Sequence, residues 1–367
     1  AAFDSAEGWV MQSSWSVNGG VAARSAVAAQ ENIHRDAAIP AGDLLLRWKI
    51  RSSNETLGIE AQLGGGFWQE GTDRRAVGRH GLLIPSAGHT RLRFAAKDGW
   101  AGSIDDVYLA EISALRARPA DIYGLWGQSN MEGGNAGPPG FGTDCGHALV
   151  EYLPGRTEAE YGTDSAALSP ALDPLQHRGG LVRGVGPGMA FGLRMLRSLA
   201  SGRRIVLVAC ARSGTSLVGP DADWAAGAGP SYVAAIAQMQ AALSLCPADS
   251  RIAGLLWSQG ESDNGQEVGT TYPAAFADML AAARADLAIP ALPVVILGPT
   301  PEGDPEGRLA ASQAGLDQDS GAAMAIPGVR FVPGPAGHAQ PGDPIHFTAA
   351  GNRLRGVAGA AALAGLA

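Results

Sequence analysis

Short apolar runs alternate with amphipathic segments from about residue 120 onward, and this pattern constrains the fold more than any other feature of the sequence. Strands that alternate with helices in this way form a parallel sheet with helices on both faces. We therefore expect one three-layer α/β domain. Its strands are predicted at 122–126, 205–209, 252–257, 294–297 and 329–332, and its helices at 189–199, 232–245, 272–287 and from about 348.

The first part of the chain has a different pattern. Apolar and polar residues alternate with a period of two up to about residue 117, as at Leu44, Leu46 and Trp48, which is typical of strands. Several such strands, separated by turn residues, predict an all-β sandwich. A length of 367 residues also favours two domains. We expect a β-sandwich accessory domain at 1–117 and an α/β domain at 118–367.

The accessory domain could bind carbohydrate. Its Trp68 and Trp100 lie in expected loops, where an indole could stack on the face of a sugar. An aromatic residue beside glycines more often packs on its own sheet, so packing is the favoured interpretation.

Composition excludes several classes of protein. A hydrophobic content of 46% and a charged content of 17% are those of a folded globular protein. The net charge of -8, with scattered arginines, argues against a nucleic-acid or anionic-membrane partner. No apolar stretch reaches the roughly 20 residues of a membrane span. Oligomeric state is not predicted.

No metal or cofactor is expected. The 3 cysteines, Cys145, Cys210 and Cys246, fit neither a disulfide framework nor a zinc pattern, and the 7 histidines lack ligand spacing. The chain opens on Ala-Ala-Phe-Asp without the features of an export signal. An extracellular or periplasmic location is favoured if a signal was removed.

The segment Gly127-Gln128-Ser129-Asn130-Met131 follows the first predicted strand of the α/β domain. A serine on the turn that leaves the carboxyl end of a buried strand lies where open α/β sheets bind ligands. This position suits a nucleophile. The alternative is that Ser129 only caps a helix.

An acid and a base stand together near the end of the chain, in Asp343-Pro344-Ile345-His346-Phe347. Residues three apart can face the same side of a tight turn, and Pro344 restricts the backbone between them. Asp343 could then orient His346, and His346 could take the proton of Ser129, as in a catalytic triad. The alternative is a surface histidine beside a helix-start carboxylate.

Acyl transfer also needs donors for the oxyanion. Two blocks that follow predicted strands could supply them, at 211–216 and at 257–263. The first block offers a main-chain amide beside Gly214, and the second offers the side-chain amide of Gln259. The main-chain amide of Ser129 would be a third donor. For Glu261 and Asp263 we favour bonds to loop amides or an arginine over a part in the chemistry.

The ordered blocks Gly-Gln-Ser-Asn-Met, a glycine-containing second block, Trp-x-Gln-Gly-Glu-x-Asp and Asp-x-x-His resemble the SGNH-hydrolase superfamily. Within it they resemble the sialate O-acetylesterases and the carbohydrate esterase family 6 acetylxylan esterases. The resemblance covers roughly residues 120–367. It implies a flavodoxin-like three-layer αβα sandwich, which agrees with the alternation of strands and helices.

The resemblance also implies roles. Ser129 corresponds to the nucleophile, His346 to the base, Asp343 to its orienter, and Gly214 and Gln259 to oxyanion donors. The second block departs from the family pattern because Ser213 replaces a glycine, so either Ser213 or Gly214 could be the donor. Candidates for supporting roles are Gln128, Asn130, Ser213 and Glu261.

The leading hypothesis is a metal-independent serine esterase that removes O-acetyl groups from a carbohydrate, either an acetylated polysaccharide or sialic acid, through an acyl-serine intermediate. One alternative is a non-catalytic glycan-binding protein or adhesin on a degenerate hydrolase scaffold. A lipid or thioester hydrolase is another, and the lack of an apolar lid segment argues against it.

Overall fold

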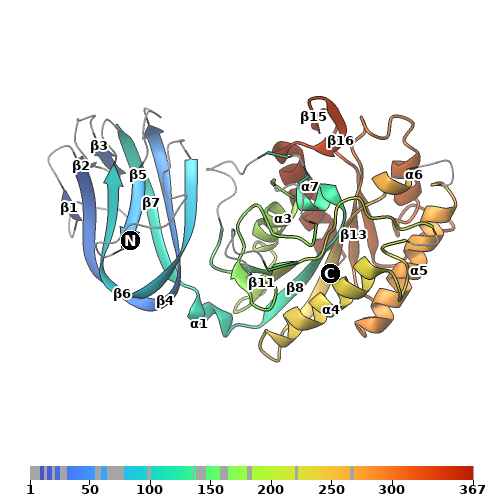
Figure 1. Ribbon diagram of the computed structural model, residues 1–367, viewed down its shortest axis with the longest axis horizontal. Coiled ribbons are helices and arrows are strands. Elements are labelled where there is room, and N and C mark those ends of the chain that lie inside the picture. Colours follow the sequence, from blue (N-terminus) through green and yellow to red (C-terminus); the bar gives the residue numbers. More distant parts are fainter. Residues whose placement is uncertain are drawn as a thin grey trace. The chain divides into compact units, whose positions relative to one another are not determined.

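The structure is a computed structural model (Figure 1). It describes residues 9–11, 15–18, 21–24, 31–53, 59–63, 78–96, 101–134, 136–137, 146–157, 164–179, 184–219, 222–264 and 268–366. The chain divides into two compact units, Ala1–Leu115 with Gly140–Ala148 and Arg116–Pro139 with Leu149–Ala367. The predicted boundary, after residue 117, is close to the division at Leu115, but the segment Gly140–Ala148 groups with the first unit.

The first unit is built on an antiparallel sheet whose strands occur where period-two alternation predicts them. Alternate residues of its longest strand, Leu44, Leu46 and Trp48, are buried, and Trp48 packs edge-to-face on Phe94 at 5.8 Å. The described strands form one sheet in the order β2-β3-β7-β4-β6-β5, with β1 beside β4. The sandwich therefore stays a prediction. The strands are β1 (Trp9–Met11), β2 (Trp15–Asn18), β3 (Val21–Arg24), β4 (Glu31–Ser53), β5 (Ile59–Leu63), β6 (Gly78–Ala96) and β7 (Gly102–Glu111).

Three residues that the sequence singles out, Trp68, Trp100 and Cys145, lie outside the described residues. Sugar stacking by the two tryptophans stays a prediction.

The second unit contains a sheet in the order β10-β9-β11-β8-β12-β13-β14. Its strands are β8 (Ala120–Gly127), β9 (Val150–Leu153), β10 (Ser169–Pro170), β11 (Arg204–Ala209), β12 (Arg251–Ser258), β13 (Val294–Leu297) and β14 (Val329–Val332). From β9 to β14 all neighbours are parallel, and β10 is antiparallel to β9. The order β11-β8-β12-β13-β14 is flavodoxin-like. All the predicted strands are confirmed.

Helices cover both faces of this sheet, as predicted. Ile122 and Trp126 of β8 face one core, which α4 and α5 complete, whereas Leu125 faces the other core, under α3 and α7 (Figure 1). The central strands β8 and β11 are buried on both sides because both faces of the sheet are covered. The helices of this unit are α2 (Ser129–Glu132), α3 (Gly188–Met195), α4 (Pro230–Ser244), α5 (Thr271–Asp286), α6 (Arg308–Ala314) and α7 (Ala349–Ala364), with a 3₁₀ turn η2 (Glu261–Asp263). A further short helix, α1 (Ser113–Arg116), spans the division between the units at Leu115.

Short elements were not predicted. The strands β9 and β10 lie between residues 132 and 188, where no strand or helix was predicted. The Asp-x-x-His segment is a strand, β16 (Asp343–Phe347), that pairs with β15 (Ala339–Gln340). The two-residue strands β10 and β15 are too short to carry a periodic signal of their own.

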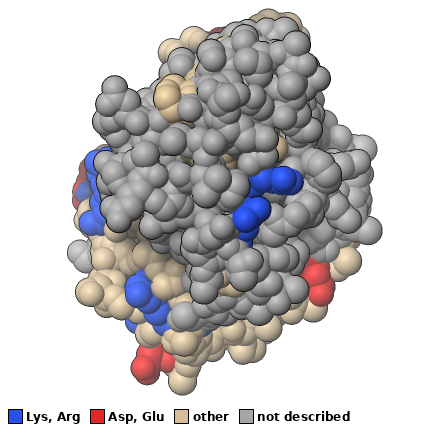
Figure 2. Space-filling view, turned by 90° about the vertical axis from the view of Figure 1, so that its left-hand side faces the viewer, with Lys and Arg blue, Asp and Glu red and all other residues tan. Residues whose placement is uncertain are grey.

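Charged side chains are dispersed over the described part of the face in Figure 2, where Lys and Arg lie in several separate places with Asp and Glu among them. Among the described residues, no helix combines the length and the apolar character that crossing a bilayer requires.

Candidate active site

The turn after β8 places Ser129 at the carboxyl edge of the sheet. Gly127 has φ +127, and an added Cβ there would lie 2.0 Å from the carbonyl oxygen of Ser258, so glycine is required. The amide of Gln128 donates to that same carbonyl at 2.8 Å. Ser129 is therefore the first residue of α2, at the point where strand order reverses around β8, which is where such sheets bind ligands.

Ser129, His346 and Asp343 form one hydrogen-bonded chain. The distance from His346 Nε2 to Ser129 Oγ is 2.8 Å, and that from His346 Nδ1 to Asp343 Oδ2 is 2.7 Å. The second carboxylate oxygen of Asp343 accepts from the amides of Ile345 and His346 at 3.2 and 3.3 Å. The acid, the imidazole and the hydroxyl thus have the order and spacing that nucleophilic catalysis needs.

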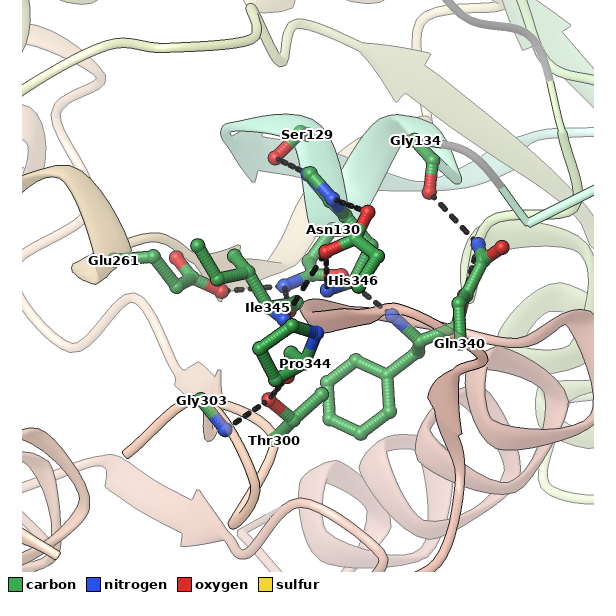
Figure 3. Close-up of polar contacts among 12 residues, drawn as sticks. Ser129, Asn130, Gly134, Glu261, Thr300, Gly303, Gln340, Pro344, Ile345 and His346 are labelled. Carbon is green, nitrogen blue, oxygen red and sulfur yellow. Dashed lines mark hydrogen bonds and ion pairs between the residues drawn. The ribbon is translucent and has the colours of Figure 1, made fainter. Parts of the chain in front are cut away.

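Neighbouring groups hold β16 in this position. The hydroxyl of Thr300 donates to the carbonyl of Pro344 and accepts from the amide of Gly303 at 3.0 Å (Figure 3). The hydroxyl of Thr348 accepts from the amide of Gly351 and caps α7. His346 is therefore fixed from both ends of its strand.

The second block lies beside the nucleophile turn, since the amide of Arg212 donates to the carbonyl of Gly127 at 3.0 Å. Its Ser213 donates through the hydroxyl to the Glu132 carboxylate. Gly214 is exposed, with φ +73, and an added Cβ there would meet nothing within 4 Å. Ser213 is thus engaged with Glu132, whereas Gly214 faces open space.

Gln259 lies at the end of β12 and is buried at 1% exposure. Its amide nitrogen donates to the Thr215 carbonyl at 3.0 Å and to Asp263, and lies 3.3 Å from Gln128 Oε1. Asp263 also accepts from the amides of Leu217 and Val218 at 2.9 and 3.1 Å, which is the loop-bonding role favoured for it. The Gln259 amide therefore faces protein acceptors in this structure.

Glu261, one of the expected supporting residues, accepts from the side-chain amide of Asn130 at 2.6 Å (Figure 3). This is neither a loop amide nor an arginine, the two partners favoured from sequence. Gln128 Oε1 accepts from Ser262 Oγ at 3.0 Å, so both neighbours of Ser129 are tied to the turn after β12.

Two buried titratable groups, neither of them indicated by the sequence, hold the second block. Glu132 accepts from the Gly179 amide at 2.8 Å as well as from Ser213, and burial raises the pKa of its carboxyl. His177 Nδ1 accepts from the Ala211 amide at 3.2 Å, and burial lowers its pKa to about 3. Glu132 directly follows the serine motif, which was the available signal, whereas nothing near His177 indicated a role.

Metal ligands do not gather in the described part of the chain. No three or more His, Cys, Asp or Glu side chains lie there in an arrangement that could hold a metal ion.

A family model described as carbohydrate esterase, sialic acid-specific acetylesterase matches residues 119–364. The chain belongs to this family. Membership confirms the predicted resemblance to the sialate O-acetylesterases and the predicted class of enzyme, a carboxylic ester hydrolase that acts on carbohydrates. The resemblance to carbohydrate esterase family 6 stays a prediction. The family match leaves out residues 1–118, which is most of the first unit.

Two solved structures show the same fold as this esterase family member. A protein from Arabidopsis thaliana is 23% identical, with a TM-score of 0.54, and the alignment covers 67% of this chain and 98% of that one. NanS is 18% identical, with a TM-score of 0.55 and coverage of 67% and 97%. A search of curated proteins gave no significant match.

Proposed function

We propose that this carbohydrate esterase removes O-acetyl groups through an acyl-serine intermediate, with Ser129 as nucleophile, His346 as base and Asp343 as its orienter. The observation that supports this is the hydrogen-bonded chain that joins the three side chains, with contacts of 2.8 and 2.7 Å. The first distance allows direct proton transfer from Ser129 to His346, and the second is a hydrogen bond that orients the imidazole.

In the first half-reaction Ser129 Oγ attacks the acetyl carbonyl carbon while His346 Nε2 takes the hydroxyl proton. The tetrahedral intermediate then breaks its bond to the sugar oxygen, which receives that proton from His346 and leaves as an alcohol. Asp343 holds the imidazole by its Nδ1 and stabilises the imidazolium between these steps.

In the second half-reaction water attacks the acetyl-serine carbonyl, and His346 Nε2 takes a proton from that water. When the bond to Ser129 Oγ breaks, the proton returns to the serine and acetate leaves. The enzyme is regenerated without any group beyond the ester and water.

For the oxyanion we propose the amides of Ser129 and Gly214. Ser129 is the first residue of α2, and the first amides of a helix have no acceptor within it. Gly214 is favoured over Ser213 because the side chain of Ser213 is held on Glu132, whereas Gly214 faces open space. Gln259 is the third candidate. Its side-chain amide can donate to the oxyanion only if it gives up its hydrogen bond to Asp263 or to the Thr215 carbonyl.

The substrate is an acetylated carbohydrate, and we propose O-acetylated sialic acid as the first to test because the matching family is described as sialic acid-specific. Acetylated xylan is the polysaccharide comparison. Acetate release from both and from p-nitrophenyl acetate should occur with the wild type and fall by about 10³-fold or more in Ser129→Ala. Equal release by both proteins would contradict the proposal, and no release by the wild type would favour a degenerate scaffold.

A further inference from the structure

Both polar atoms of the Asn130 side chain make hydrogen bonds across the site. It is fully buried, and its Nδ2 donates to the Ile345 carbonyl at 2.9 Å and to Glu261 Oε1 at 2.6 Å (Figure 3). Its Oδ1 accepts from the Phe347 amide at 3.1 Å. The main chain on both sides of His346 is therefore bonded to the residue that follows Ser129.

These bonds join two segments that are otherwise far apart in sequence. Asn130 and Phe347 are separated by 217 positions, as are Ser129 and His346. Because Ser129 and Asn130 are consecutive in the single-turn helix α2, any shift of β16 relative to α2 breaks the Asn130 bonds and lengthens the contact between Ser129 and His346. The spacing of the reacting groups is thus set by a neighbouring side chain.

Glu261 gives this amide its orientation. An asparagine side chain can exchange its oxygen and nitrogen by rotation, and only one orientation points a donor at the Ile345 carbonyl. A carboxylate accepts and does not donate when it is ionised. With Glu261 beside Nδ2, the rotated amide would place its oxygen against two acceptors.

Arg355 supports the same arrangement from the core. At 1% exposure it donates to the Asn130 carbonyl at 3.1 Å and to Ser258 Oγ at 2.6 Å, and its guanidinium lies 4.2 Å from the centre of the Phe347 ring. Burial lowers its pKa to about 10, and the charge of Glu261 opposes this. The guanidinium thus ties α2, the end of β12 and β16 together.

We propose that Asn130 and Glu261 are a positioning pair, which sets the distance between Ser129 Oγ and His346 Nε2 and does not itself take part in bond making. This rests on the proposed function, because it assigns the pair to the same serine and histidine. Their hydrogen bonds go to each other and to the main chain around His346, so their effect passes through the imidazole.

The test compares Asn130→Ala, Glu261→Ala, the double variant and Glu261→Gln for kcat and KM on p-nitrophenyl acetate. We expect each alanine variant to lower kcat on the order of 10²-fold, with KM changed less than about 3-fold, because a misplacement near 1 Å costs this much. The double variant should be no worse than either single one, since both remove one interaction. Glu261→Gln should recover most activity, because a glutamine carbonyl also accepts from Asn130.

Gln238→Ala is the matched control. Gln238 is a buried amide of α4 that donates to the Pro154 carbonyl at 2.7 Å, so its loss costs stability without touching the serine or histidine. Wild-type kcat in Asn130→Ala, with a stability loss like that of Gln238→Ala, would overturn the proposal. Glu261→Gln as inactive as Glu261→Ala would also overturn it, because charge rather than position would then matter, and this comparison remains if Asn130→Ala fails to fold. Ser129→Ala is measured in the same assay to separate the positioning proposal from the proposed function. Full activity of Ser129→Ala would contradict the proposed function itself.

Discussion

His346 Nε2 lies 2.8 Å from Ser129 Oγ, although 217 positions separate the two residues. Ser129 follows the central strand β8, and His346 lies on β16 just before the last helix. The contact therefore exists only when the whole α/β unit is folded. Changes at the residues that pack around this contact should alter turnover more than they alter stability.

Gly134 is one such residue. A Cβ added to it would lie 3.0 Å from Ser129 Cβ and 3.2 Å from His346 Cδ2, so a methyl group would crowd both reacting side chains. We predict that Gly134→Ala lowers kcat/KM on p-nitrophenyl acetate by about 10-fold or more. Gly269→Ala, whose added Cβ would meet nothing within 4 Å, should keep wild-type turnover. Equal turnover in both variants would refute this crowding.

Glu132 should make the stability of the protein depend on pH. Burial raises the pKa of its carboxyl above the ordinary 4.5, so the folded protein keeps a proton that the unfolded chain loses. Its contribution is present below pH 4.5 and is lost as the pH rises through the raised pKa. Glu132→Gln mimics the protonated carboxyl and should gain stability over the wild type as the pH rises through that window.

Urea unfolding of both proteins between about pH 4 and about pH 8 measures this difference. Groups that titrate in the same way in both proteins cancel in this difference of unfolding free energy. A difference in unfolding free energy that stays constant with pH would show that Glu132 does not titrate in this way.

His177 should give the opposite dependence. Burial lowers its pKa from 6.5 to about 3, so the folded protein holds the neutral ring while the unfolded chain takes up a proton. Its contribution is present above pH 6.5 and is lost as the pH falls toward 3, at up to about 1.4 kcal/mol per pH unit.

Thermal or urea unfolding of His177→Gln tests this, since glutamine keeps an acceptor for the Ala211 amide but takes up no proton. We predict a shallower loss of stability in acid than the wild type has. An identical acid slope in the two proteins would contradict burial of a neutral imidazole.

The sequence could predict the strands of the α/β unit because they are buried on both faces. The apolar run at Ile122–Trp126, for example, lies in β8, where every residue is buried. The residues of the hydrogen-bonded chain were also predicted, because Ser129, Asp343 and His346 stand in short motifs whose order along the chain is distinctive. Apolar runs and the order of motifs can both be recognised directly in the sequence.

The contacts that support the site could not be predicted in this way. The bond from Ser213 to Glu132 joins residues 81 positions apart, and that from Asn130 to Glu261 joins residues 131 positions apart. These contacts depend on how the loops at the edge of the sheet pack, and loop packing leaves no periodic pattern in the sequence. For the same reason, the sequence indicated supporting roles for Asn130 and Glu261 without indicating that they bond to each other.

The central claim is that Ser129 is a nucleophile activated by His346. Its most direct test is mass-spectrometric mapping of a fluorophosphonate label in the wild type and in His346→Ala. We predict a label on the peptide that contains Ser129 in the wild type, and labelling slower by about 10²-fold or more in His346→Ala. A label on another residue, or equal labelling rates in the two proteins, would contradict the account.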